Sequence, residues 1–431
     1  MRAGPVILVM FLLLFSSLPL APEVAGAGSE QYILEHRIRS GDTSINPSPI
    51  EGINSIDWSP DGSRIVTGGY DGNIKIWNGE TANLEKTIPY ENVVISVAWS
   101  PNGQLIAAAG HGHSVKIFSA QNGNIIRTIE PFTGVVYSVA WSSDGRWLAA
   151  AGSQNNTVRV WDWDSGALYR TFSVSAEEVN EVAWSPNSGQ LASISYDSEI
   201  NIWDVSNGDL LMNNINRFTS RTRSFSYRKS IAWSPDGRYI AASAITYGGN
   251  VLFLEASPSK SLTFLYPIET DNCTRWDPKI GWSPMGSRLA VATDDVEIWD
   301  VTTIDEPRLV DILCLSRDGI SSVAWSCDGR RFAAANSTGA IFIWAMDSDW
   351  DRVPDYKDFL PFFDNRLFFI STSIFLIFLG YLITGWTVIR RRKTGGARGI
   401  RQKRSKSSEK RKTKEQYRAP ALPYPSEIDE R

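Results

Sequence analysis

Histidine and cysteine, the residue types that most often bind metals or act as nucleophiles, are scarce in this chain. Its 431 residues include three His and three Cys. Two of the histidines stand one residue apart, in His111-Gly112-His113, a spacing that can chelate a metal ion. A zinc site needs three or four ligands, however, and no Cys or acidic cluster lies near this pair in sequence. We interpret the pair as a polar turn and predict neither a metal nor another cofactor.

Aspartate recurs at one place along the sequence, and paired carboxylates are what glycoside cleavage requires. The recurring residues are Asp61, Asp144, Asp236 and Asp328. Each directly precedes a Gly, a combination typical of tight turns, and each belongs to a different repeat. We therefore interpret them as turn residues. The sequence also has no Gly-x-Ser-x-Gly elbow, phosphate loop or His-Glu-x-x-His motif, and we predict that the chain is not an enzyme.

Cations interleaved with aromatic residues indicate a different chemistry, the recognition of anions. Residues 213–230 combine four Arg and one Lys with Phe218, Phe225 and Tyr227, and residues 269–277 hold an adjacent Arg and Trp. Such groups suit a carboxylate, a phosphate or an acidic protein patch. The alternative is a pair of solvated loops without a binding role. The predicted partner-binding residues are Arg217, Phe218, Arg221, Arg223, Arg228, Arg275 and Trp276.

The elements that must position these loops come from an internal repeat. The segment Ile53-Asn54-Ser55-Ile56-Asp57-Trp58-Ser59-Pro60-Asp61-Gly62 recurs in degraded form, 41 to 49 residues apart, with its Trp at positions 58, 99, 141, 184, 233, 282 and 325. A second apolar pair follows most of these Trp residues. Those pairs are Ile76-Trp77, Ile117-Phe118, Val160-Trp161, Ile202-Trp203, Phe253-Leu254, Ile298-Trp299 and Ile343-Trp344.

Each repeat predicts four short strands. In the first repeat they cover residues 53–58, 64–69, 74–77 and 84–88, and turns rich in Pro, Asp, Asn and Gly separate them. Four strands at a period of 40–45 residues are typical of a propeller blade.

The chain resembles the WD-repeat β-propeller family. The residues that carry the resemblance are the Trp-Ser-Pro-Asp-Gly turns at 58–62 and 233–237, with Val160-Trp161-Asp162, Ile202-Trp203-Asp204 and Ile298-Trp299-Asp300. The Gly-His pair common before the first strand of such repeats is absent from every unit. Leu254 replaces the usual Trp of the fifth repeat, and the sixth repeat is two residues short before Trp299. The resemblance covers roughly residues 31–349 and implies an all-β, seven-bladed propeller that acts as an interaction platform.

The ring is expected to close through its N-terminal segment. The seventh repeat supplies only three strands, at 321–325, 331–335 and 340–344, and then enters an acidic stretch. Residues 32–38 have the pattern of an outer strand such as residues 83–88. Inserting them into the seventh blade would pair the open sheet edge.

The two ends of the chain predict a topology. Residues 1–27 have a positive start, an apolar stretch and a small-residue end, the pattern of a secretory signal peptide, with an uncleaved anchor as the alternative. Residues 367–389 carry no charge and 14 of the 23 are Leu, Ile, Phe or Val, which predicts one transmembrane helix. Four cations follow at 390–393, so the C-terminal tail is expected in the cytoplasm and the propeller outside it.

These segments divide the chain into a signal peptide (1–27), a propeller (28–349), a short acidic stalk (350–366), a transmembrane helix (367–389) and a basic tail (390–431). The tail holds 15 basic and 5 acidic residues, a net charge of +10, whereas the whole chain carries −4. It is low in apolar residues and is expected to be disordered. Its charge suits anionic lipid headgroups, or serves only as a stop-transfer signal. We predict no nucleic-acid binding.

An extracytoplasmic location would permit a disulfide between Cys273 and Cys314, whereas Cys327 replaces a turn proline and is expected to stay free. It would also permit glycosylation at the sequons of Asn155, Asn272 and Asn336, all of which fall on the face expected to bind partners. The function we predict is a non-catalytic, membrane-tethered scaffold that binds protein partners at the cell surface or in an organelle lumen. The alternative is an extracytoplasmic hydrolase or glycan-binding protein, which would need a converging cluster of titratable groups in the central channel.

Overall fold

The computed structural model describes residues 31–39, 52–129, 132–153, 156–174, 178–214, 229–244, 250–256, 264–268, 278–313 and 319–347. All regular secondary structure within these ranges is β-strand. None of the described residues forms a helix that is long and apolar enough to cross a bilayer. The predicted signal peptide, stalk, transmembrane helix and basic tail lie outside the described residues.

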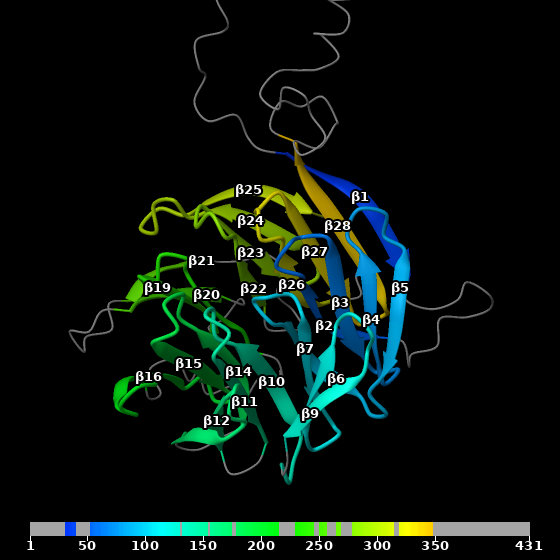
Figure 1. Cartoon of the computed structure of the whole chain (residues 1–431). Coiled ribbons are helices and arrows are strands. Elements are labelled where there is room, and N and C mark those ends of the chain that lie inside the picture. Colours follow the sequence, from blue (N-terminus) through cyan, green and yellow to red (C-terminus); the bar gives the residue numbers. More distant parts are fainter. Residues whose placement is uncertain are drawn as a thin grey trace, which may run out of the picture. The chain divides into compact units, whose positions relative to one another are not determined.

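The 28 described strands form seven antiparallel sheets of four strands each, arranged as the blades of a propeller (Figure 1). The predicted all-β, seven-bladed propeller is therefore confirmed. In the first repeat, the predicted strands agree with the observed ones to within one residue at each end. The reason is that each strand is bounded by a turn whose Gly, Asn or Asp residues are readable in the sequence.

The first four blades follow one another along the chain. Blade one consists of β2 (Ile53–Trp58), β3 (Arg64–Gly69), β4 (Asn73–Asn78) and β5 (Leu84–Pro89). Blade two consists of β6 (Val94–Trp99), β7 (Leu105–Gly110), β8 (Val115–Ser119) and β9 (Ile125–Ile129). Blade three consists of β10 (Val136–Trp141), β11 (Trp147–Gly152), β12 (Thr157–Asp162) and β13 (Leu168–Ser173). Blade four consists of β14 (Val179–Trp184), β15 (Gln190–Ser195), β16 (Ile200–Asp204) and β17 (Leu210–Asn214).

The remaining blades include the two with the shortest innermost strands. Blade five consists of β18 (Ile231–Trp233), β19 (Tyr239–Ala244), β20 (Asn250–Glu255) and β21 (Phe264–Ile268). Blade six consists of β22 (Lys279–Trp282), β23 (Arg288–Ala292), β24 (Val296–Asp300) and β25 (Arg308–Leu313). Blade seven consists of β26 (Ile320–Trp325), β27 (Arg331–Asn336), β28 (Ala340–Asp347) and the N-terminal β1 (Gln31–Arg39).

The N-terminal strand closes the ring, as the sequence predicts. β1 runs antiparallel to β28, with Tyr32 opposite Met346 and Ile38 opposite Ile341 (Figure 1). The side chain of Tyr32 is buried and meets the indole of Trp325 edge to face, with 6.0 Å between ring centroids. Blade seven thus joins the two ends of the propeller within one sheet.

Small side chains let the blades pack closely near the axis. The second strands of blades two, three and seven each carry three consecutive, fully buried alanines. In blades one, four, five and seven, the Trp that ends the innermost strand reaches across to the preceding blade, where its indole N–H donates to a backbone carbonyl. Trp58 donates to Ala324 at 3.2 Å, and Trp325 donates to Gly281 at 3.0 Å.

The recurring aspartates lie in the turns between first and second strands. The carboxylate of Asp61 accepts hydrogen bonds from the Ser59 hydroxyl at 2.6 Å and the Ser63 backbone N–H at 3.0 Å. The Ser59 bond is the main reason that the pKa of Asp61 lies below its ordinary value. Asp144, Asp236 and Asp328 accept the equivalent serine hydroxyl, so their interpretation as turn residues is confirmed. We call the face formed by these turns the turn face, and the opposite one the loop face.

Candidate functional site

The predicted partner-binding residues lie in two segments that are outside the described residues. Arg217, Phe218, Arg221, Arg223 and Arg228 belong to residues 215–228, and Arg275 and Trp276 belong to residues 269–277. Their binding role therefore stays a prediction. The residues that begin and end these two loops are described, however, and they show how the loops are held.

Both ends of the first loop are attached to the same turn of blade four. Before the loop, the Asn213 amide donates to Glu199 Oε1 at 2.9 Å. After the loop, the Lys229 ammonium donates to the Ser198 hydroxyl at 2.7 Å. Lys229 is 1% exposed and Glu199 is 3% exposed. Because these hydrogen bonds are shielded from water, they fix the entry and exit of the loop firmly.

The second loop ends beside the first. Lys279, the first residue of β22, directs its ammonium toward the Lys229 carbonyl at 3.5 Å and toward Glu181 Oε2 at 3.6 Å. Glu181 belongs to blade four, so the contact spans blade five. The Asn201 amide also donates to Glu199 Oε1, at 3.0 Å. We call the set of residues at the ends of both loops the root network: Glu181, Ser198, Glu199, Asn201, Asn213, Lys229 and Lys279. Its two Glu and two Lys balance in charge, which is a condition for burying ions together.

We expect Asn213→Ala to lower the free energy of unfolding by about 1.5–3 kcal/mol, because it removes a donor from the buried Glu199 carboxylate. Urea denaturation of the full-length chain measures this change. Asn207→Ala is the matched control, since Asn207 is exposed and its side chain bonds to the carboxylate and the backbone N–H of Asp209 in its own turn. Equal losses from the two substitutions would contradict the assignment of Asn213 to a buried network.

The central channel is lined by a belt of serines. Each serine stands third in an innermost strand or just before it, and its hydroxyl accepts the backbone N–H of the next blade. The donors lie 3.1–3.2 Å away, and the serines are Ser55, Ser96, Ser138, Ser230 and Ser322. Blades four and six carry Glu181 and Lys279 at the equivalent position. The ion pair therefore takes the place of two serines and joins the blades on either side of blade five.

Beside Ser and Ala, the innermost strands of the described blades carry one Asp, one Glu and one Lys: Asp57, Glu181 and Lys279. His111 and His113 are exposed on the turn between β7 and β8. In the described part of the chain, no group of three or more His, Cys, Asp or Glu could hold a metal ion. Cys327 is a free thiol, and Cys273 and Cys314 lie outside the described residues.

Comparison with known families agrees with this geometry. The model described as "WD domain, G-beta repeat" matches residues 47–78, 84–119, 123–162, 166–204 and 310–345. The chain carries WD40 repeats. The matches cover blades one to four and blade seven. The matches leave out most of blades five and six. In blade five, Leu254 stands where the repeat usually has Trp, and in blade six the repeat is shortened before Trp299.

Several curated proteins are similar to part of this chain. Minichromosome loss protein 1 of Schizosaccharomyces pombe is 23% identical over 203 residues, 46% of this chain and 23% of that protein. Protein HIR1 of Cryptococcus neoformans is 26% identical over 220 residues, 48% and 24% of the two chains. Nuclear distribution protein PAC1 of Arthroderma otae is 31% identical over 161 residues, which are 35% of this chain and 32% of that protein. The aligned part thus spans between a quarter and a third of the length of these relatives.

Neighbouring WD40 blades are tied at their outer strands. A side chain from the third position of an outer strand donates to a backbone carbonyl of the next blade. Lys86 reaches Gln121, Arg127 reaches Trp163, and Arg170 reaches Ser206. The ring nitrogen Nε2 of His36 on β1 lies 2.7 Å from the Glu80 carbonyl, so the closing strand makes the same contact with blade one.

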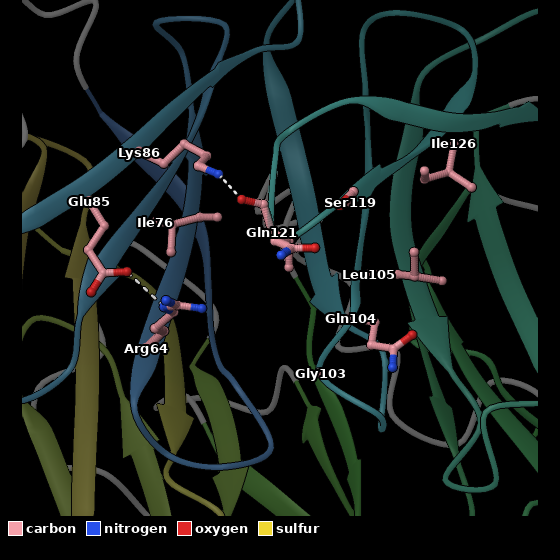
Figure 2. Close-up of a pocket in the computed structure, with 11 residues that line it drawn as sticks. Arg64, Ile76, Glu85, Lys86, Gly103, Gln104, Leu105, Ser119, Gln121 and Ile126 are labelled. Carbon is pink, nitrogen blue, oxygen red and sulfur yellow. Dashed lines mark hydrogen bonds and ion pairs between the residues drawn. The ribbon is translucent and has the colours of Figure 1, made fainter.

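The groove between blades one and two is open, with a volume of about 620 Å³. Figure 2 shows Lys86 pointing across it to Gln121, with the Arg64–Glu85 ion pair of 2.7 Å on one wall and Gln104 on the other. In the next groove, the Arg127 guanidinium stacks on Trp163 with its carbon 4.3 Å from the ring centroid. The charges of the Figure 2 groove are already paired with groups of the chain, so we assign it a structural role.

One sequon asparagine of the loop face is buried in the folded chain. Asn336 is 1% exposed, and its side-chain oxygen accepts hydrogen bonds from the Thr338 N–H, the Thr338 hydroxyl and the Ala340 N–H. A buried amide in this turn cannot meet a glycosyl-transferring enzyme without local unfolding. Asn155 and Asn272 lie outside the described residues.

Sequence reasoning missed Asp57, a carboxyl on the innermost strand of blade one near the turn face. Its two oxygens accept the backbone N–H groups of Trp58 at 2.9 Å and Trp99 at 2.8 Å. Desolvation nevertheless raises the pKa of Asp57 to about 7, against the effect of these two hydrogen bonds. A signal was present in the repeat, because the other six blades carry Ala or Gly at this position: Ala98, Ala140, Ala183, Ala232, Gly281 and Ala324.

Proposed function

We propose that the chain is a non-catalytic, membrane-tethered WD-repeat scaffold that binds protein partners outside the cytoplasm. WD-repeat propellers commonly bind protein partners. The observation that carries the proposal is the root network, which holds the ends of two loops rich in cations and aromatic residues on one face of a rigid ring. Loops positioned by a rigid framework are where binding residues concentrate.

The contact surface would consist of Arg217, Phe218, Arg221, Arg223 and Arg228 on the first loop, with Arg275 and Trp276 on the second. Cations beside aromatic residues recognise carboxylates and phosphates through charge-assisted, often bidentate hydrogen bonds. The partner would therefore present an acidic or phosphorylated surface to the loop face.

The membrane location rests on the two ends of the sequence. Residues 1–27 have the features of a secretory signal peptide, and residues 367–389 have the length and apolarity of a membrane-spanning helix. The four cations at 390–393 favour a cytoplasmic tail. In this arrangement the propeller stands outside the cytoplasm, at the cell surface or in an organelle lumen.

Crosslinking in intact membranes tests the contact surface. Replacement of Arg217, Arg221, Arg223 and Arg228 by Ser should lower the amount of captured partner at least fivefold, because the loop loses four charges. The control replaces four exposed arginines elsewhere on the propeller and should capture normally: Arg146, Arg238, Arg308 and Arg330. Unchanged capture by the first variant would dismiss the loop as the contact surface.

Protease added to sealed cells or vesicles tests the orientation separately. The propeller should be accessible and the tail protected. Digestion of the tail alone would reverse the proposed topology.

A further inference from the structure

The turn-face mouth of the central channel contains a cavity of about 430 Å³ between blades six, seven and one. Its walls are apolar and aromatic except for one carboxyl and one thiol. The lining residues are Ile56, Asp57, Gly281, Trp282, Pro284, Val323, Ala324, Trp325 and Cys327. The cavity lies on the turn face, opposite the β15–β16 turn to which the root network attaches.

Two departures from the repeat create this cavity. Gly281 stands where five other blades have Ala. A Cβ at this position would lie 3.3 Å from Val323 Cγ2 and 3.4 Å from Trp325 Cδ1, so Gly281 leaves space that Ala would fill. The indole of Trp282 also turns toward its own turn and donates to the Gly286 carbonyl at 3.1 Å. In contrast, Trp58, Trp184, Trp233 and Trp325 donate to the preceding blade.

Asp57 gives the cavity a site for a cation. Each of its oxygens accepts one backbone N–H, and a carboxylate oxygen can accept a further hydrogen bond. The surroundings are negative, because Asp57, Asp328 and Asp61 add to burial in raising the pKa of the Cys327 thiol. The nearest described arginines are engaged elsewhere. Arg331 donates to Gly79 and Gly62 carbonyls, and Arg64 pairs with Glu85.

We propose that this mouth binds an arginine side chain of a protein partner, with Asp57 accepting the guanidinium and Trp282 and Trp325 packing against it. A guanidinium fits because it is planar, donates in a fork, stacks on aromatic rings and is more weakly hydrated than an ammonium. This inference rests on the proposed scaffold function. It adds a second contact, in which the turn face binds a basic group of the partner, to the proposed contact of the loop face with an acidic surface.

Arginine binding at this mouth depends on pH. The charged and titratable groups on the elements packed against β2 are Asp61, Arg64, Cys327, Asp328 and Arg331. Among these, the pKa of Asp61 is lowered and that of the Cys327 thiol is raised, so neither group changes charge between pH 6 and 8. Because the pKa of Asp57 is about 7, its ionised fraction falls about tenfold from pH 8 to pH 6. The affinity for a cation falls by the same factor.

The test is calorimetric titration of the full-length chain in detergent with Nα-acetyl-L-arginine amide, using Nα-acetyl-L-citrulline amide as the neutral analogue. We expect the arginine probe to bind about tenfold more weakly at pH 6 than at pH 8 and the citrulline probe not to bind. Asp57→Asn should weaken binding of the arginine probe at least tenfold. Asp144→Asn, which changes the charge of the same face by the same amount, should not alter it.

A second variant keeps the test decisive if Asp57→Asn fails to fold. Gly281→Ala introduces the residue that five other blades already carry, and it should weaken binding at least threefold by filling the cavity. The loop variant with four Arg→Ser replacements should bind the probe normally, so failure of this site and failure of the loop surface are distinguishable. Equal binding of the citrulline probe, or unchanged binding by both Asp57→Asn and Gly281→Ala, would overturn the proposal.

Discussion

Tyr32→Ala should lower the free energy of unfolding by about 3 kcal/mol, because it empties a buried aromatic site at the only seam where the two ends of the propeller meet in one sheet. Tyr32 is 5% exposed and packs against Trp325. Its backbone N–H also lies 3.4 Å from the Asp311 carboxylate of blade six. The thermal midpoint should fall by roughly 6 °C at about 2 °C per kcal/mol.

Leu34→Ala provides the matched control on the same strand. Leu34 pairs with Trp344 through the backbone, but its side chain is 47% exposed. Its truncation should change the free energy of unfolding by no more than about 0.5 kcal/mol. Differential scanning fluorimetry of both variants measures the contrast. If Tyr32→Ala melts with the parent, or if both variants lose equal stability, β1 does not close the ring through Tyr32.

The fold was largely predictable because the features that define it are local and repeated. In the sequence, each blade is recognised by a Trp, a turn of the Pro-Asp-Gly type and a second apolar pair. The closing strand was predictable for a different reason. The seventh repeat lacks an outer strand, and residues 32–38 repeat the pattern of such strands, so the missing partner could be identified by elimination.

The root network could not be predicted, because its contacts depend on side-chain directions between distant positions. Glu199 and Lys229 are 30 residues apart, and nothing in their neighbouring sequence shows that both are buried. The sequon of Asn336 illustrates the same limit. Its three-residue pattern is correct, but the turn directs the amide inward. The sequence could therefore identify the loops rich in arginine and aromatic residues, but not the groups that hold their ends.

Asp57 lies between these cases. An alignment of the seven repeats against one another isolates it as the only carboxylate in a column of Ala and Gly. The surroundings of its carboxyl are set only when the seven repeats close into the propeller. Apolar residues of blades six and seven, among them Val323 and Ala324, then lie beside the carboxyl, and burial leaves it poorly solvated.

This desolvation makes the stability of the propeller fall as pH rises from 4 to 7. The pKa of Asp57 is about 7 in the folded chain against an ordinary value of 3.8, so in this window the folded state holds a proton that the unfolded state has released. Stability decreases with pH wherever the folded state binds more protons. At about 1.4 kcal/mol per pH unit up to the folded pKa of about 7, the loss between pH 5 and pH 8 is about 3 kcal/mol, nearly all of it below pH 7.

Asp57→Asn should remove this dependence, because an amide carries no titrating proton. Urea denaturation at pH 5 and pH 8 should show that the parent loses about 3 kcal/mol more than the variant between the two values. Asp61→Asn is the matched control on the adjoining turn. The pKa of Asp61 is lowered, so its contribution to the free energy of unfolding stays constant between pH 5 and pH 8. That contribution is lost only as the pH falls below the ordinary carboxyl range. If the parent and Asp57→Asn respond to pH in parallel, the carboxyl is solvated in the folded chain, and the channel mouth loses the group that would recognise a cation.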